Sequence, residues 1–130
     1  MIVGIGSDLL DTRRIEAVIG RQGQRFLDRI FTLHEQERAQ GRSNPNGTYA
    51  KIFAAKEAVV KALGTGVAKG VSWKDIEIQR EQWSAPKVVL RGPALDAFTK
   101  MIPPGKVGAI HLTITDEPPY CLAFVVLSAG

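Results

Sequence analysis

The segment of residues 49–63, YAKIFAAKEAVVKAL, constrains the fold more than any other part of the chain. At helical spacing, alanine and larger apolar residues occupy most of its circumference, and Gly64 follows at the position where a helix commonly ends. A helix with so little polar surface has to be buried by other elements. The segment therefore predicts a central helix around which the rest of the chain is built.

The remaining periodic segments predict an α+β fold. Before the central helix we expect a strand over 1–6, helices over 9–19 and 24–31, a helix capped by the Thr32/Glu35 capping box, and a loop over 41–48. After it we expect strands over 75–79 and 87–91, a helix over 93–102, and strands over 107–115 and 120–127. This order favours one domain with an antiparallel or mixed sheet and its helices on one side. Trp73 and Trp83, which flank the first hairpin, are expected to anchor it by packing.

Composition narrows the function less than the pattern does. Of the 130 residues, 17 are basic and 13 acidic, which gives a net charge of +4 and modestly favours an acidic or phosphorylated partner. The basic residues are spread over several segments, which argues against nucleic acid as the partner. The single cysteine, Cys121, lies in an apolar strand and is expected to be buried. No apolar stretch is long enough for export or for spanning a membrane, so a cytoplasmic location is expected.

Three charged residues stand on the central helix where burial gives little reason for them. Lys56 falls inside the apolar arc, and Glu57 and Lys61 lie one turn apart at its edge. We expect this carboxylate and these two ammonium groups to point toward one neighbourhood at the margin of the core. The alternative is an exposed ion pair between Glu57 and Lys61, with Lys56 extending its ammonium to solvent.

Asp8, just after the first strand, is the second candidate carboxylate. It could cap the following helix, or it could join Glu57 in binding a divalent cation. In phosphate chemistry Mg²⁺ commonly takes one or two carboxylates together with phosphate oxygens and water. Lys56 and Lys61 would then offset phosphate charge, and backbone amides of Gly64-Thr65-Gly66 could approach the phosphate.

Three segments along the chain carry a recognisable pattern. They are GIGSDL at 4–9 with Arg14-Ile15, FAAKEA at 53–58 continued by KALGTG at 61–66, and HLTIT at 111–115. In order and spacing they resemble the signatures of the holo-acyl-carrier-protein synthases, the small trimeric phosphopantetheinyl transferases. The resemblance implies transfer of the phosphopantetheine arm of coenzyme A to a serine of apo-acyl carrier protein, with release of adenosine 3′,5′-bisphosphate.

The resemblance also implies roles for individual residues. Asp8 and Glu57 would bind Mg²⁺, and Lys61 would face the reacting phosphate. His111 and Thr113 would line the coenzyme A site from a neighbouring subunit of a homotrimer, although a strand histidine is more often structural. Glu57, a metal-held water and Lys61 are all open as acceptors of the serine proton.

A carrier-binding face is expected after the first strand. The resemblance places Arg14 against the carrier, and arginines recur at intervals of seven and four residues from there. With the apolar residues between them, they would form one face if the chain stays helical past residue 20; otherwise they are an ordinary solvated basic surface. The predicted face consists of Arg14, Val18, Arg21, Arg25 and Phe26.

Two positions depart from the family pattern. Ile52 stands where many members have arginine, so a basic contact to the nucleotide is missing or is supplied by Lys51. Asp116 stands where many members have histidine.

The competing functions are another Mg²⁺-dependent phosphotransferase acting on a nucleotide, and a non-catalytic basic module that docks an acidic protein.

Overall fold

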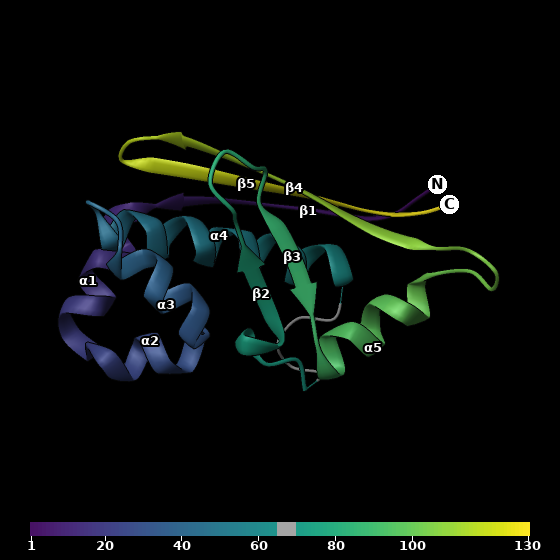
Figure 1. The fold of residues 1–130 in the computed structure, drawn as a ribbon, viewed down its shortest axis with the longest axis horizontal. Helices are drawn as coiled ribbons and strands as arrows, with labels where there is room; N and C mark the ends of the chain where they lie inside the picture. The colour runs from purple at the N-terminus through teal and green to yellow at the C-terminus, as the bar shows by residue number, and fades with distance from the viewer. Residues whose placement is uncertain (65–69) are drawn as a thin grey trace.

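The computed structural model describes residues 1–64 and 70–130. Three long strands form an antiparallel sheet in the order β1-β5-β4, built from β1 (Ile2–Asp11), β4 (Gly108–Glu117) and β5 (Tyr120–Ala129). A separate antiparallel hairpin consists of β2 (Ile76–Gln79) and β3 (Lys87–Leu90). The helices all lie on one side of the three-stranded sheet (Figure 1). The predicted α+β class is confirmed, and the pairing in the described residues is antiparallel throughout.

The central helix is α4 (Pro45–Leu63), which packs against β1 and β5. Ala54, Ala55 and Ala58 have no exposed surface, as expected for a helix without a polar face. The helix begins four residues earlier than predicted, because the Asn44 side chain accepts a hydrogen bond from the Gly47 N–H and Pro45 suits the first helical position. The predicted loop over 41–48 is therefore wrong for its second half.

Helices α1 (Thr12–Gln22), α2 (Gln24–Ile30) and α3 (Leu33–Gln40) follow β1. The capping box at Thr32 is confirmed by reciprocal hydrogen bonds with Glu35. Helix α1 starts later than predicted, because β1 continues to Asp11 and the side chain of Asp11 caps the helix. The helix also passes Gly20 and ends only at Gly23, whose φ of 59° lies in the left-handed region.

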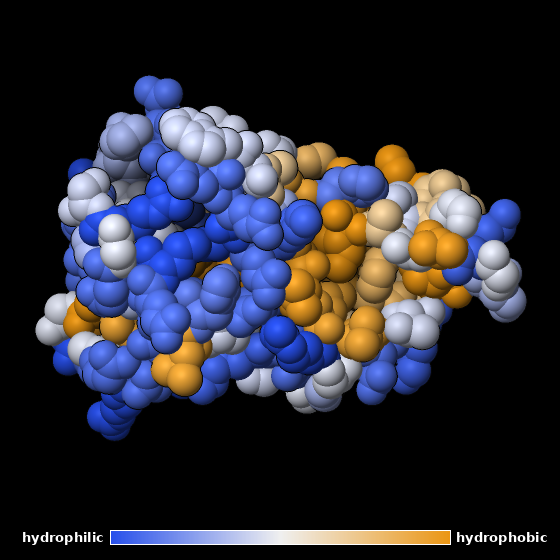
Figure 2. Space-filling model, in the orientation of Figure 1, coloured by the Kyte–Doolittle hydropathy of each residue, from blue (hydrophilic) through white to orange (hydrophobic). Residues whose placement is uncertain are grey.

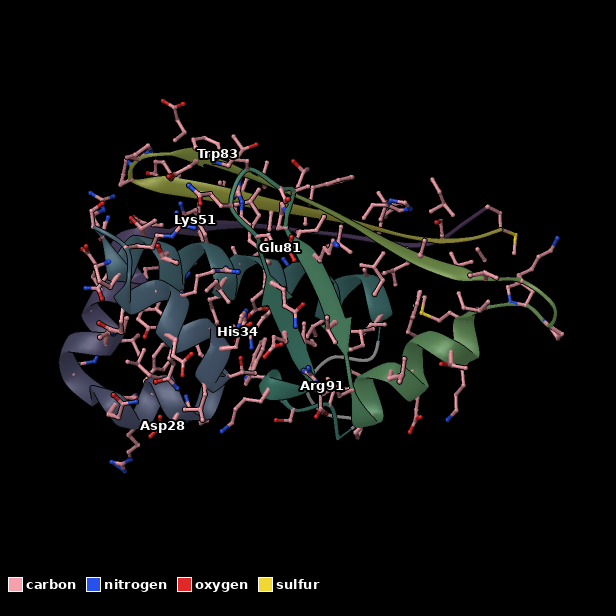
Figure 3. The ribbon with its side chains drawn as sticks, viewed as in Figure 1. Asp28, His34, Lys51, Glu81, Trp83 and Arg91 are labelled. Atoms are coloured by element: carbon pink, nitrogen blue, oxygen red, sulfur yellow. The ribbon has the colours of Figure 1, made fainter. Side chains whose placement is uncertain are left out.

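The hairpin and α5 (Gly92–Met101) cover the rest of α4. Trp73, in the short 3-10 helix η2 (Trp73–Asp75), packs on Phe53 with ring centroids 5.3 Å apart. Trp83 lies in the β2–β3 turn and is 94% exposed, so its predicted packing role is wrong (Figure 3). Apolar residues gather on the visible face where β3, β4 and α5 meet (Figure 2). None of the helices within residues 1–64 and 70–130 is long and apolar enough to cross a membrane.

Candidate active site

Asp8 lies on the face of β1 that points toward α4. Gly4, Gly6, Asp8 and Leu10 pair with residues of β5 that are themselves buried, which identifies the inner face of the sheet. The side chain of Asp8 is 16% exposed. Since the helix cap is Asp11, the alternative role of Asp8 as a cap is wrong. Its carboxylate, which does not cap the helix, is available to a site between β1 and α4, where Lys61 contacts it.

Glu57 and Lys61 meet Asp8 from α4. The Lys61 Nζ donates to the Ser7 carbonyl oxygen at 2.9 Å and to Asp8 Oδ1 at 3.3 Å. Glu57 is half-buried, and its pKa is raised above the ordinary value, first by desolvation and then by the charge of Asp8. Lys61 and Arg14 act in the opposite direction. The structure therefore brings together two predicted carboxylates and one predicted lysine. Arg14 lies close enough for its charge to lower the pKa of Glu57.

The Asp8–Glu57 pair suits a cation that brings other ligands with it. Burial and then the charge of Asp8 raise the pKa of Glu57, so a cation between the two carboxylates would favour the charged form of Glu57, and the ammonium of Lys61 already lies next to Asp8. Within residues 1–64 and 70–130, no group of three or more His, Cys, Asp or Glu residues could hold a metal ion. The donor set thus fits Mg²⁺ completed by phosphate oxygens and water, and not a metal caged by protein alone.

Lys56 corrects the sequence prediction. Its Nζ lies 2.7 Å from Glu35 Oε1 and donates to the carbonyl oxygens of Ile30 and Trp73, and the side chains of both Lys56 and Glu35 are fully buried. Glu35 Oε2 in turn accepts from the Ile78 N–H at 2.7 Å. Lys56 therefore points away from Lys61 and is out of reach of a phosphate. The physical reason is that a carboxylate from α3 enters the core there and holds the ammonium.

His111 and Thr113 lie on the opposite face of the sheet from Asp8. On β4 they pair with Val126 and Phe124 of β5, both on the outer face, and His111 Nε2 lies 3.0 Å from Ser128 Oγ. Because the sheet separates them from α4, one chain does not bring them to Glu57. A role for His111 and Thr113 at a site on another subunit stays a prediction.

The predicted carrier face forms a pocket of about 340 Å³ between α1, α2 and α4. Its lining includes the predicted Arg14, Val18, Arg21 and Phe26, together with Phe53. Phe26 is only 5% exposed and packs edge-on against Phe31, so it forms the floor and is not the exposed contact we expected. Arg25 lies beyond the turn at Gly23 and does not line the pocket.

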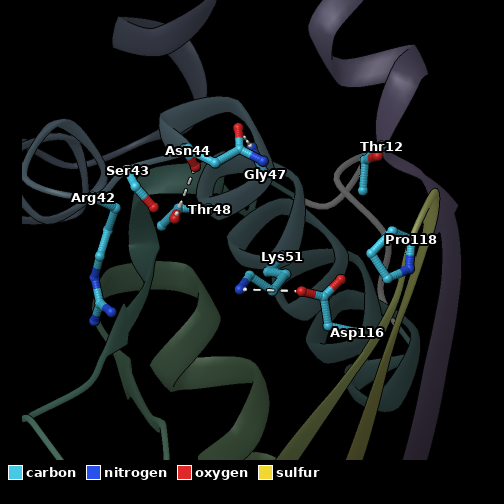
Figure 4. Close-up of a pocket in the computed structure, with 9 residues that line it drawn as sticks. All are labelled: Thr12, Arg42, Ser43, Asn44, Gly47, Thr48, Lys51, Asp116 and Pro118. Atoms are coloured by element: carbon cyan, nitrogen blue, oxygen red, sulfur yellow. Dashed lines mark hydrogen bonds and ion pairs between the residues drawn. The ribbon is translucent and has the colours of Figure 1, made fainter.

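A second, polar pocket of about 240 Å³ lies beside the N-terminal half of α4 (Figure 4). Lys51 and Asp116 both line this pocket, and Lys51 Nζ lies 3.6 Å from Asp116 Oδ2. Lys51, the basic residue next to Ile52, is therefore paired with Asp116, the second residue that departs from the family pattern. Arg42 also lines this pocket, and Arg38 and Arg80 line a smaller one next to it. The sequence reasoning missed these arginines; the four-residue spacing of positions 38 and 42 was the available signal.

The glycine-rich exit of α4 is only partly described. Gly64 ends the helix in the left-handed conformation, with φ 71°, as its position predicted. Thr65 and Gly66 lie outside the described residues.

Comparison with known proteins gives one consistent result. Residues 4–121 match the model of the 4′-phosphopantetheinyl transferase superfamily. A holo-[acyl-carrier-protein] synthase of Mesorhizobium japonicum is 53% identical over 129 residues, covering 99% of this chain and 94% of that protein. The crystal structure of the synthase of Neisseria meningitidis has a TM-score of 0.84 at 37% identity, covering 98% of this chain and 99% of that one. That of Bacillus anthracis, in complex with CoA (3′,5′-ADP), has a TM-score of 0.77 at 33% identity, covering 98% and 96%.

Proposed function

Since the chain belongs to the 4′-phosphopantetheinyl transferase superfamily, we propose that Asp8, Glu57 and Lys61 form its phosphate-handling centre. The chain is a transferase of the holo-acyl-carrier-protein synthase type: it moves the 4′-phosphopantetheine arm of coenzyme A to a serine of apo-acyl carrier protein. Adenosine 3′,5′-bisphosphate is the other product. The observation that carries the site proposal is the raised pKa of Glu57 beside Asp8, with Lys61 bonded to the same aspartate.

Each residue of this centre has a distinct part. Asp8 and Glu57 would hold Mg²⁺ through one or two carboxylate oxygens. When bound, the ion would supply positive charge that neutralises charge on the pyrophosphate. Lys61 has a side chain that is 55% exposed, so its ammonium can leave Asp8 and turn to an incoming phosphate oxygen. Glu57, a metal-held water and Lys61 are the three candidate acceptors of the serine proton.

A homotrimer with shared sites is the assembly we propose. The outer face of the three-stranded sheet exposes large apolar side chains to solvent. These are Ile5, Leu9, Leu122 and Phe124. His111 and Thr113 stand on the same face. Burying it against a different surface of the next subunit would form a closed ring and carry these two residues to a neighbour's coenzyme A. Gly64, with Thr65 and Gly66, would approach the coenzyme A bound at the chain's own Asp8, Glu57 and Lys61 through backbone amides.

The carrier is proposed to dock at the α1 pocket. Arg14 and Arg21 supply positive charge at its rim, and Val18 with the buried floor of Phe26 supplies apolar surface. This combination fits a small acidic protein that inserts an apolar side chain between charged contacts. Arg25 would act from outside the pocket by long-range attraction. The cytoplasmic location stays a prediction from the sequence.

One experiment tests the function and its rivals together. The chain is incubated with coenzyme A, Mg²⁺ and unmodified carrier, and the carrier is then weighed by mass spectrometry. We expect a gain of one phosphopantetheine, and no gain with the folded Asp8→Ala or Glu57→Ala variants. A complex without mass gain would support the docking module instead, and phosphate transfer to another nucleotide would support the other phosphotransferase.

A further inference from the structure

We propose that Gly6 is a positioning residue for the metal pair: its missing side chain lets β1 approach α4 closely enough to set Asp8 beside Glu57. This inference rests on the proposed function, because it concerns where the two carboxylates stand. It concerns the strand–helix contact that carries them and not a further ligand.

The contact is made between backbones. A Cβ built on Gly6 would overlap the carbonyl oxygen of Ala58, and it would lie 2.7 Å from the Ala62 nitrogen and 3.1 Å from the Ala58 carbonyl carbon. These are backbone atoms of α4, so no side chain can rotate out of the way. A methyl group needs roughly 3.5 Å from such atoms, so alanine at this position has to push β1 and α4 apart by about 1 Å.

The α4 atoms that this methyl group would displace belong to residues next in sequence to the site residues. Ala58 follows Glu57 and Ala62 follows Lys61, while Asp8 is the next residue after Gly6 on the same face of β1. A shift at this contact therefore changes the separation of Asp8 from Glu57 directly. Mg²⁺ requires near-ideal geometry at about 2.0–2.1 Å, and a 1 Å displacement of a reacting group costs about 100-fold in rate.

Loss of stability alone would not establish this role, because any overpacked contact destabilises a core. The discriminating quantity is cation binding. It is measured with Mn²⁺, by electron paramagnetic resonance of the free ion, in the presence of coenzyme A and without carrier. Coenzyme A alone provides the blank.

Two substitutions serve as controls for Gly6→Ala. Gly20→Ala places a methyl group in open space on α1, and Leu90→Ala removes core volume from β3, away from the site. We expect Gly6→Ala to bind Mn²⁺ at least about tenfold more weakly, and both controls to bind it as the unaltered chain does. If Leu90→Ala weakens binding as much as Gly6→Ala does, the effect is general loosening and the inference is overturned.

A compensating change sharpens the test. Asp8→Glu lengthens the side chain by one methylene, a C–C bond of about 1.5 Å, which is enough to span a displacement of about 1 Å. We expect it to weaken Mn²⁺ binding in the unaltered chain and to strengthen it in Gly6→Ala. The same sign in both backgrounds would refute positioning.

Failure of the metal assignment can be told apart from failure of this inference. If Asp8→Ala leaves Mn²⁺ binding unchanged, the proposed site is wrong and the inference falls with it. If Asp8→Ala abolishes binding but Gly6→Ala does not weaken it, only the inference is wrong. Should Gly6→Ala not fold, Gly4→Ala carries the test on the same strand, because a Cβ there would overlap only one backbone atom of α4, the Ala62 carbonyl oxygen, while its other two close atoms are movable ends of Met101 and Leu127.

Discussion

A Lys56→Met variant should be less stable than the unaltered chain, while its site at Asp8, Glu57 and Lys61 stays unchanged. Methionine has a similar length but no charge, so Glu35 would remain in the core without its partner at 2.7 Å. The carbonyl oxygens of Ile30 and Trp73 would lose their donor as well. Breaking a buried ion pair by removing one partner costs about 3–5 kcal/mol.

The corresponding shift in melting temperature can be worked out from chain length. At about 2.1 cal/mol/K per residue, the unfolding entropy of 130 residues is about 0.27 kcal/mol/K, so the expected decrease is about 11–18 °C. Adding Glu35→Gln removes the stranded charge and keeps one oxygen for the Thr32 or Ile78 N–H. We expect this double variant to recover about half of the loss or more.

Thermal unfolding is measured by circular dichroism at one protein concentration. Carrier modification is measured at a temperature well below the unfolding transitions of the unaltered chain and the variant. The matched control is Lys61→Met, which removes an exposed lysine of the same helix. It should lose transfer while its stability changes by no more than about 1 kcal/mol, because surface ion pairs contribute little. A Lys56→Met protein that melts like the unaltered chain but cannot modify the carrier would refute the structural role and restore Lys56 to the phosphate.

Three further predictions concern the carrier face, the shared site and pH. Replacing Arg14, Arg21 or Arg25 singly by Glu should raise the Michaelis constant for the carrier at low salt but not that for coenzyme A, with the smallest effect at Arg25, outside the pocket. If carrier kinetics stay unchanged at low salt in all three, the docking face lies elsewhere. Mixed Glu57→Ala and His111→Ala chains should regain activity after subunit exchange, and no recovery would contradict a shared site. The raised pKa of Glu57 means that the folded chain binds its proton more tightly than the unfolded chain does, so ionising it costs stability as pH rises above about 4.5. Without metal, Glu57→Gln should therefore melt no lower than the unaltered chain at pH 7, with the difference fading in acid; a clearly lower melting temperature would show that the carboxylate is stabilised when charged.

Local patterns were sufficient for much of the fold. The apolar circumference of α4, the Thr32 capping box and the stop at Gly64 depend on residues within a few positions of one another, so the sequence could predict them. Element ends were less predictable where competing caps stood close together. Asp8 and Asp11 both offer a carboxylate before a helix, and only the length of the β1–β5 pairing decided for Asp11.

The candidate site shows the same division. Helical spacing and the family signatures together singled out Asp8, Glu57 and Lys61, which the structure brings together. Helical spacing also placed Lys56 with them, and that was wrong. A helical wheel gives the direction in which a side chain leaves the backbone, but a lysine has a long, flexible stem whose charged end lies wherever a carboxylate compensates its desolvation.

Partners that come from distant segments were decided by tertiary structure alone. Glu35 reaches Lys56 from α3, and Asp116 reaches Lys51 from β4, pairings that no local periodicity contains. The close approach at Gly6 is of the same kind, since a glycine in a strand does not show which backbone lies against it. The positions of the charged residues and of the helices follow from residue order, because they depend on neighbours along the chain. Which charge meets which, and at what distance, depends on packing between elements, and only the folded chain supplies that.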